Sequence, residues 1–468
     1  MLSQDVPFGK VEATSNEVDL DTALQEEVKR RFRFFSIVGY MVILASTWEY
    51  ASTSPQSENK MLRFWLFRYS LVTSVFSLSN GGTAGTIWLT LIACCGMSVE
   101  YASRFAPPGY QKPLSYAVGW LCALGWQSAM PLISYTAAQQ VIALIATCQA
   151  DFVWKGWQGA LLTIAFVVFA ILFNMFAINK MPLIEGLVVT IHMWQTLVAV
   201  VGPSSALIGA DAAVHLAEEL KDASYILPRA MVSSALINYA TAFTMIISFV
   251  SAIDPAILED VLATSTGQPW VAVIRHVTGS QAATIALAVV MCFQLTFTSI
   301  NQATTSSRQL WAFARDKGVP FHGFLSKVSE RDGVPHNAVF VTLGSTVIII
   351  GSTIAFNVIL SVCNVALIIS YIICIATMVA KRLRGEKLPL SRFNLGRAGL
   401  FINVAALCWL SVLGVFLCFP AVPNPTPASM NWACLMFGVV MIFACVWYFV
   451  RGRHEYDGPV RYIRKDVE

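Results

Sequence analysis

Long stretches of this chain carry no charge, and the charged residues gather in the short stretches between them. A helix that spans a bilayer needs about 20 mostly apolar residues, and twelve runs approach that length. The runs cover residues 34–50, 82–99, 114–148, 160–178, 183–201, 204–216, 230–253, 282–304, 338–354, 356–379, 399–419 and 430–450. The pattern predicts an all-α polytopic membrane protein with about twelve transmembrane helices, because a helix pairs its own backbone groups within hydrocarbon.

The small number of charges excludes other classes of protein. Charged residues make up 12% of the chain, against roughly 25% in ordinary soluble proteins. The 31 basic and 27 acidic residues cannot cover the surface of a soluble chain of 468 residues. The composition therefore excludes a soluble enzyme, a disordered chain and a disulfide-stapled secreted domain. A net charge of +4 gives no reason to expect binding to nucleic acid. The lipid bilayer is therefore the large partner that we expect.

Lysine and arginine predict the orientation, because cytoplasmic loops carry most of them. If the N-terminus is cytoplasmic and the runs alternate, only Lys155 and Arg275 lie in outer loops, and three more lie between residues 52 and 71. The other basic residues fall on the cytoplasmic side. We therefore expect a cytoplasmic tail over residues 1–33, a membrane domain over 34–450 and a second cytoplasmic tail over 451–468. The protein would be a multi-pass protein of the plasma membrane or the vacuolar membrane.

Motifs for catalysis and for cofactors are absent. The sequence has no P-loop, no G-x-G-x-x-G, no H-E-x-x-H and no G-x-S-x-G, so ATP hydrolysis and intramembrane hydrolase chemistry lack their residues. None of the eleven cysteines forms a C-x-x-C pair. We therefore expect no enzyme activity, no cofactor and no metal, which leaves a secondary transporter or a channel.

Two apolar runs are interrupted near mid-membrane, each beside a carboxylate. An interruption frees backbone N–H and C=O groups, which are costly in hydrocarbon unless a polar ligand binds them. The alternative is that glycine and serine are there to pack helices. The predicted substrate-binding residues at these interruptions are Ser46, Thr47, Trp48 and Glu49 in the first run and Gly209, Ala210 and Asp211 in the sixth.

Gln127 in the third run and Asn301 in the eighth are uncharged polar residues at membrane depth. We add both to the candidate substrate-binding residues. Hydrogen bonding between helices explains them equally well.

Several segments resemble the fungal amino acid, choline and GABA permeases of the amino acid–polyamine–organocation superfamily. The resemblance covers nearly the whole chain, in the right order. It is carried by residues 35–39 (FSIVG), 48–49 (WE), 80–85 (NGGTAG), 105–108 (FAPP), 110–112 (YQK), 119–120 (GW), 125–127 (GWQ), 208–224 (IGADAAVHLAEELKDAS), 227–230 (LPRA) and 307–316 (SRQLWAFARD). It implies a LeuT-like fold of two inverted five-helix repeats plus two C-terminal helices.

The resemblance also implies a role for histidine. Proton-coupled members of the superfamily place a titratable cation on the fifth helix, and His192 lies in the middle of the fifth run. His215 follows Asp211 by one helical turn and is the second candidate for proton coupling. The alternatives are a neutral His192 that packs against a neighbouring helix, and a solvated His215 at the cytoplasmic end.

The sequence departs from the family in three places: an insertion in the first run, a missing piece between Ser98 and Glu100, and an outer segment reduced to little more than Gly202 and Pro203. Residues 52–71 insert a polar and basic stretch, with Lys60, Arg63 and Arg68, where the first helix should continue. Basic residues at that depth are costly. The insertion indicates either an imperfect gene model or a divergent, inactive family member.

These observations predict a secondary active transporter for a small-molecule substrate, an amino acid or a related amine such as GABA or choline, with protons as the coupling ion. The first alternative is an amino-acid sensor without net transport. The second is a channel, which would need a continuous polar stripe where the sequence has isolated polar groups.

Overall fold

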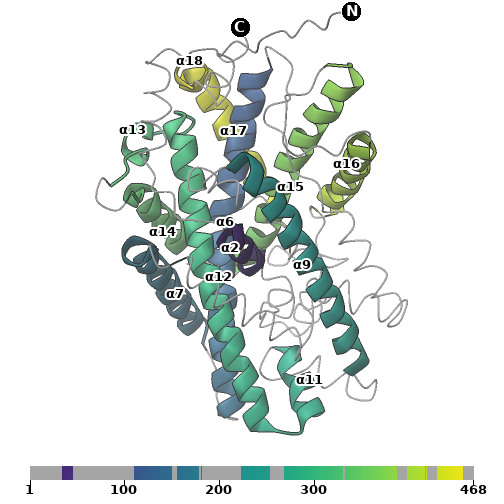
Figure 1. Ribbon diagram of the computed structural model, residues 1–468. Helices are drawn as coiled ribbons and strands as arrows, with labels where there is room; N and C mark the ends of the chain where they lie inside the picture. Colours follow the sequence, from purple (N-terminus) through teal and green to yellow (C-terminus); the bar gives the residue numbers. More distant parts are fainter. Residues whose placement is uncertain are drawn as a thin grey trace, which may run out of the picture.

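In the computed structural model, nine ranges of the chain and two single residues are described. The ranges are residues 34–45, 110–149, 155–178, 223–252, 268–329, 333–350, 353–386, 398–416 and 430–456, and the single residues are 181 and 418. Within these residues every regular element is a helix (Figure 1). The all-helical architecture that the apolar runs predict is therefore present throughout the described part.

Nine of the predicted runs coincide with helices, and the second, fifth and sixth runs lie outside the described residues. The helices are α2 (Phe34–Ala45), α6 (Gln111–Cys148), α7 (Gly156–Phe176), α9 (Ala223–Ala252), α11 (Pro269–Thr278), α12 (Gln281–Arg315), α13 (His322–Leu325), α14 (His336–Ile350), α15 (Thr353–Leu383), α16 (Ala398–Phe416), α17 (Ala433–Trp447), the π-helical turn η5 (Tyr448–Gly452) and α18 (Arg453–Glu455).

Five helical segments in the described part are long and apolar enough to cross a membrane. They are Lys112–Cys148, Gly156–Phe176, Gln281–Arg315, Val362–Leu383 and Ala433–Glu455. The protein is accordingly a polytopic membrane protein. The expected total of twelve helices extends into residues outside the described ranges and stays a prediction.

Two helices extend beyond their predicted runs. The eighth run was expected to end at residue 304, but α12 continues to Arg315, because its polar residues are buried in protein and need no lipid. The seventh run was expected to begin at residue 230, but α9 begins at Ala223 and contains Pro228. Pro228 is the sixth residue of α9, so its missing N–H leaves the carbonyl of Ser224 without its intrahelical donor.

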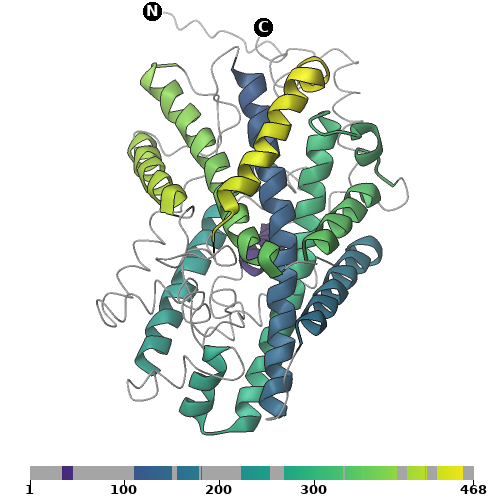
Figure 2. The same cartoon turned by 180° about the vertical axis from the view of Figure 1, so that it is seen from behind.

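Helices α6 and α12 run side by side along the length of the molecule, in opposite directions (Figures 1 and 2). The start of α6 lies at the same end as α13, α18 and the end of α12, and α11 lies at the other end (Figure 1). Helix α15 crosses α6 closely, because Gly125 has no side chain: a Cβ there would lie 2.6 Å from Leu367 Cγ. Small residues at such crossings let membrane helices approach.

Helix α17 contributes little to the interior. Only 11% of the most apolar stretch of the segment Ala433–Glu455 is buried inside the protein. Four of its large apolar side chains are exposed, namely Leu435, Val439, Ile442 and Val446. An exposed apolar helix is unfavourable in water and natural in lipid. Its surface is therefore that of a lipid-facing helix.

Candidate functional site

Of the predicted site residues, the described ranges contain Gln127 and Asn301. The first-run residues Ser46, Thr47, Trp48 and Glu49, the sixth-run residues Gly209, Ala210 and Asp211, and the histidines His192 and His215 lie outside the described ranges. The site is therefore built from the helices that surround Gln127 and Asn301.

A continuous polar segment of α12, residues 298–309, forms the centre of the described helices, and we call it the polar belt. Every residue in it is buried, and ten of the twelve are polar. Such a segment, polar on all sides and buried on all sides, is surrounded by protein and not by lipid. Its polar residues are Thr298, Ser299, Asn301, Gln302, Thr304, Thr305, Ser306, Ser307, Arg308 and Gln309.

The short helix α2 contacts the polar belt through its backbone and one tyrosine. The Tyr40 hydroxyl donates to the Asn301 carbonyl at 2.8 Å and also shares a hydrogen bond with the Thr305 hydroxyl. In return, Asn301 Nδ2 points to the Tyr40 carbonyl at 3.5 Å. One turn further on, Thr298 Oγ1 donates to the Ile43 carbonyl at 3.1 Å. Ile43 lies in the last described turn of α2.

Asn301 has an unused acceptor. Its side chain is 1% exposed, and Oδ1 has no hydrogen-bond partner in the described part of the chain. A buried carbonyl oxygen without a donor costs free energy. Asn301 therefore presents an acceptor that could receive an N–H group or a cation, between α12 and the end of α2.

The helix α6 contacts α12 from another side, through three glutamines that we call the glutamine ladder; two of them, Gln302 and Gln309, belong to the polar belt. Gln309 Nε2 donates to the Gly119 carbonyl at 3.2 Å, Gln302 Nε2 to the Trp126 carbonyl at 3.3 Å, and Gln281 Nε2 to the Thr147 carbonyl at 3.1 Å. All three bonds fit one antiparallel register. The interval from Gly119 to Trp126 on α6 equals the interval from Gln309 back to Gln302 on α12, and the interval from Trp126 to Thr147 equals the one from Gln302 back to Gln281. The register of the two helices is thus fixed over nearly their whole length.

Gln127 joins three helices. Its Nε2 donates to the Ser306 carbonyl on α12 and to Thr342 Oγ1 on α14, both at 3.1 Å. Its Oε1 accepts from Ser345 Oγ of α14 at 3.2 Å. Both amide protons are therefore used between helices. This geometry supports the interhelical alternative for Gln127, and a contact with substrate stays a prediction.

Helix α7 contacts the polar belt through Asn174. Asn174 Nδ2 donates to the Ile300 carbonyl at 3.0 Å, and Thr304 Oγ1 donates to Asn174 Oδ1. Asn174 is fully buried. Three helices, α2, α6 and α7, thus make side-chain hydrogen bonds to one twelve-residue segment of α12.

A second polar feature lies further along α6. Gln139 and Gln140 are both nearly fully buried, and neither side-chain amide has a hydrogen-bond partner in the part of the chain that the structure describes. Gln140 follows Trp126 by fourteen residues, four helical turns, so the ladder's register places it opposite Ala288. Alanine offers no hydrogen bond, so the Gln140 amide stays unpaired within the α6–α12 interface.

No cluster of histidine, cysteine, aspartate or glutamate within the described residues could hold a metal ion. The polar groups that gather there are hydroxyls, amides and backbone carbonyls. Such groups bind a polar or charged small molecule through hydrogen bonds, and they do not supply a nucleophile with its base.

Comparison with known proteins identifies the family to which this chain belongs. The family model described as "Amino acid permease" matches residues 188–442, more than half of the chain. This chain belongs to the amino acid permease family. It is a member of a transporter family of the amino acid–polyamine–organocation superfamily and not an enzyme, as the sequence predicts.

Individual relatives from fungi agree with this membership. An uncharacterised amino-acid permease of Schizosaccharomyces pombe is 27% identical, over 83% of this chain and 78% of its own length. The choline transporter of Saccharomyces cerevisiae is 23% identical, over 92% of this chain and 83% of its own length. Amino-acid permease 2 of Neurospora crassa is 29% identical over 55% of this chain and 47% of its own length. The resemblance inferred from the sequence motifs is confirmed.

Sequence reasoning missed two residues that this geometry brings to the site. Tyr40 lies in an apolar run, where a tyrosine looks like ordinary core. Thr305 follows the predicted end of its run. The density of Ser, Thr, Asn and Gln over residues 298–309 was the signal that could have found the polar belt.

Proposed function

We propose that this permease is a secondary active transporter of an amino acid or a related amine, such as GABA or choline. The observation that carries the proposal is the polar belt, a buried polar segment contacted by α2, α6 and α7 inside helices long enough to span a membrane. A polar centre of this kind is costly to bury unless it serves a polar solute. The names of the relatives, amino-acid permeases and a choline transporter, support the substrate class.

In the proposed architecture, twelve helices form two inverted five-helix repeats followed by two further helices. The substrate's charged head group lies between the interruption at residues 46–49 and the interruption at residues 209–211. Asn301 is the described residue that fits this site best. Its free Oδ1 lies one turn of α12 away from Thr298, which donates to the last turn of α2, the helix whose run continues toward Ser46.

The proposed orientation places both termini in the cytoplasm, and the arrangement of the helices supports it. The start of α6, the end of α12, α13, the end of α15 and α18 all lie at one end of the molecule (Figures 1 and 2). These ends carry most of the basic residues of the described part, namely Lys112, Arg315, Lys317, Lys381, Arg382, Arg384, Arg451 and Arg453. Helix α11, at the opposite end, carries Arg275 alone. A basic end of this kind is typical of the cytoplasmic side.

The decisive experiment is uptake by a transport-deficient host that expresses the chain, with a panel of radiolabelled amino acids, choline, GABA and polyamines. We expect accumulation of one class against its gradient, and Asp211→Asn should abolish it at unchanged surface expression. Glu386→Gln, which alters an exposed carboxylate at the end of α15, is the matched control and should transport normally. Binding without accumulation would favour the sensor, and flux that never exceeds equilibrium would favour a channel.

We further propose that protons drive the uptake and that His192 carries the coupling proton, with His215 as the second candidate. Because histidine changes charge between about pH 5 and 8, uptake should rise as the outer medium is acidified. His192→Gln should flatten this response, while His276→Gln, on the exposed face of α11, should keep it. Identical pH profiles for the wild type and His192→Gln would remove His192 from the coupling pathway.

A further inference from the structure

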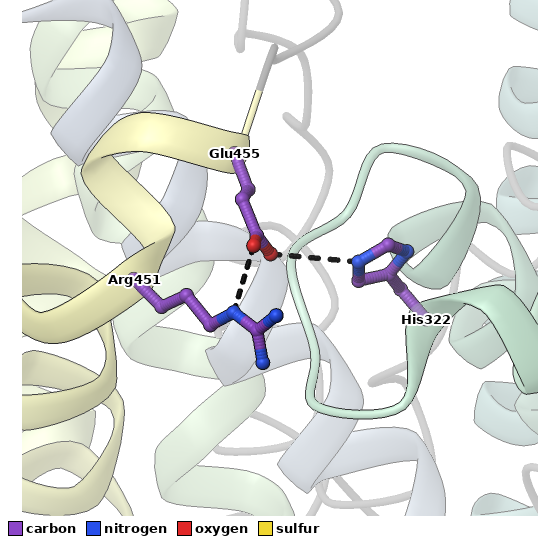
Figure 3. Close-up of polar contacts among 3 residues, drawn as sticks. All are labelled: His322, Arg451 and Glu455. Carbon is purple, nitrogen blue, oxygen red and sulfur yellow. Dashed lines mark hydrogen bonds and ion pairs between the residues drawn. The ribbon is translucent and has the colours of Figure 1, made fainter.

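Three segments far apart in the sequence meet at the end of the molecule where α6 begins. They are the start of α6, the segment around α13 (residues 316–329), which we call the α13 loop, and residues 451–456 at the end of the last helix (Figures 1 and 3). We propose that residues 451–456 form a C-terminal clasp, which couples the conformation of the last helix to that of the α13 loop. The proposal concerns the described residues only and does not depend on which substrate the permease carries.

The clasp is anchored by a buried tyrosine. Tyr456 follows the last helical residue, yet it is 2% exposed, and its hydroxyl donates to Ser115 Oγ of α6 at 3.2 Å. Its ring lies 5.2 Å from that of Tyr116 and 6.1 Å from that of Phe313, measured between ring centroids. Burial raises the pKa of the Tyr456 hydroxyl. Tyr456 is therefore held against the helices by its ring and its hydroxyl.

Helix geometry brings the clasp to this position. The π-helical turn η5 ends at Gly452, which is buried against Tyr116: a Cβ on Gly452 would lie 3.4 Å from the Tyr116 ring. Lys112 Nζ donates to the Arg453 carbonyl at 2.8 Å. A lysine that caps a carbonyl at a helix C-terminus stabilises that end. Both contacts come from the first two turns of α6.

The link to the α13 loop is polar. The Glu455 carboxylate lies between a guanidinium and an imidazole (Figure 3): Arg451 Nε is 2.7 Å from Oε1, and His322 Nε2 is 3.5 Å from Oε2. Figure 3 shows His322 reaching Glu455 from the loop, while Arg451 reaches it from the same helix end. These side chains are one-third exposed or more, so the pairs are weaker than buried ones and can open without unfolding the protein.

The α13 loop is itself held in a defined shape, so the contact at His322 can transmit a change. Phe321 has a φ of 57°, which is uncommon for a residue other than glycine and persists where neighbours hold it. Trp311 Nε1 donates to the Ser326 carbonyl at 3.0 Å, and Asn337 Nδ2 donates to the Phe324 carbonyl at 2.7 Å. The loop is thus tied to α12 and α14. It meets the clasp where His322 contacts Glu455 and through Val319 and Leu325, which share an apolar cluster with Tyr456.

Hydrogen–deuterium exchange on the purified full chain in lipid nanodiscs tests the coupling. The backbone amides of Phe324 and Ser326 donate hydrogen bonds within the loop, and the amide of Tyr456 donates to the Gly452 carbonyl. The exchange rates of these amides therefore report separately on the opening of the loop and of the clasp. We expect Glu455→Gln to speed exchange at the loop amides by about threefold or more, and His322→Gln to speed exchange at Tyr456 by a similar factor. The reciprocal effect is required, because a coupling acts equally in both directions.

Two further variants keep the test decisive. Glu386→Gln removes a carboxylate from an ion pair of similar exposure at the end of α15, so it should change neither reporter. The double variant His322→Gln with Glu455→Gln should exchange no faster than the faster of the two single variants. Unchanged loop exchange in Glu455→Gln, or independent and additive effects in the double variant, would overturn the coupling. If Glu455→Gln fails to fold, His322→Gln carries the test alone, because it removes the same contact from the side of the loop, and unchanged exchange at Tyr456 in that variant overturns the coupling.

Discussion

The α6–α12 interface and the α2–α12 interface use the same polar belt in different ways. The glutamine ladder distributes its bonds from Gly119 to Thr147 of α6, so separating α6 from α12 breaks bonds along the whole contact. The bonds of α2 are confined to two turns around Tyr40 and Ile43 of a twelve-residue helix. From this difference we expect α6 and α12 to move as one body, and α2 to separate from α12 at a lower cost.

The largest effect is expected at Asn301, which belongs to the α2 interface and carries an acceptor, Oδ1, that has no partner among the described residues. Asn301→Leu removes the contact with the Tyr40 carbonyl and the unused Oδ1 together. A lost interaction with a buried polar group is worth about 1–3 kcal/mol, and each 1.36 kcal/mol is about tenfold in rate. We expect uptake to fall about tenfold or more at normal amounts of folded protein. Normal uptake by this variant would place the substrate away from the α2 interface.

The next largest effect is expected on stability, in the glutamine ladder. The double variant Gln302→Met with Gln309→Met removes two bonds to α6 carbonyls. Interhelical hydrogen bonds in membranes contribute about 0.6 kcal/mol each on average, so the protein should unfold at a lower temperature in a detergent melting assay. Uptake per folded molecule should stay near the wild-type value. A transport defect at unchanged melting temperature would contradict the view of α6 and α12 as one body.

A smaller effect is expected at Tyr40. Tyr40→Phe keeps the buried ring and removes only the hydroxyl that donates to the Asn301 carbonyl. A single hydrogen bond contributes about 1 kcal/mol. If α2 leaves α12 during transport, the variant should change the maximal uptake rate a few-fold while the melting temperature changes little. Equal changes in both quantities would indicate that Tyr40 has a purely structural role.

The smallest effect, of opposite sign, is expected at Gln140. Its amide is buried without a partner in the described part of the chain, so Gln140→Met should leave stability unchanged or raise it slightly. Gln302→Met alone is the matched control, because it loses a real hydrogen bond and should lower the melting temperature. If Gln140→Met instead lowers uptake at unchanged stability, the Gln140 amide receives a ligand during the transport cycle.

The sequence predicts the class and most helices of this protein because lipid imposes a simple rule on composition. The run at 160–178 and the helix Gly156–Phe176 nearly coincide, since lipid-facing residues must be apolar. The rule fails where protein replaces lipid around a helix. The polar residues after Thr304 look like the end of a span, yet they are buried in the continuing α12.

The candidate site is less predictable for the same reason. Gln127 and Asn301 stand out in apolar runs, but their roles depend on partners from α2, α12 and α14 that only the fold brings together. Tyr40 gives no signal at all, since its ring is ordinary in a core and its hydroxyl matters only beside Asn301. Local composition therefore predicts polar candidates, and their chemistry depends on contacts between distant segments.

The fixed register of α6 and α12 has a consequence for the surrounding bilayer. With 38 and 35 residues, the two helices are about 57 and 52 Å long at 1.5 Å per residue, whereas the hydrocarbon layer is about 30 Å thick. Both helices therefore project well beyond the acyl chains. Because the ladder opposes sliding of one helix past the other, we expect the pair to tilt as a unit when the membrane becomes thicker or thinner. Such a tilt would swing the projecting ends sideways, so bilayer thickness would be a mechanical input to this permease.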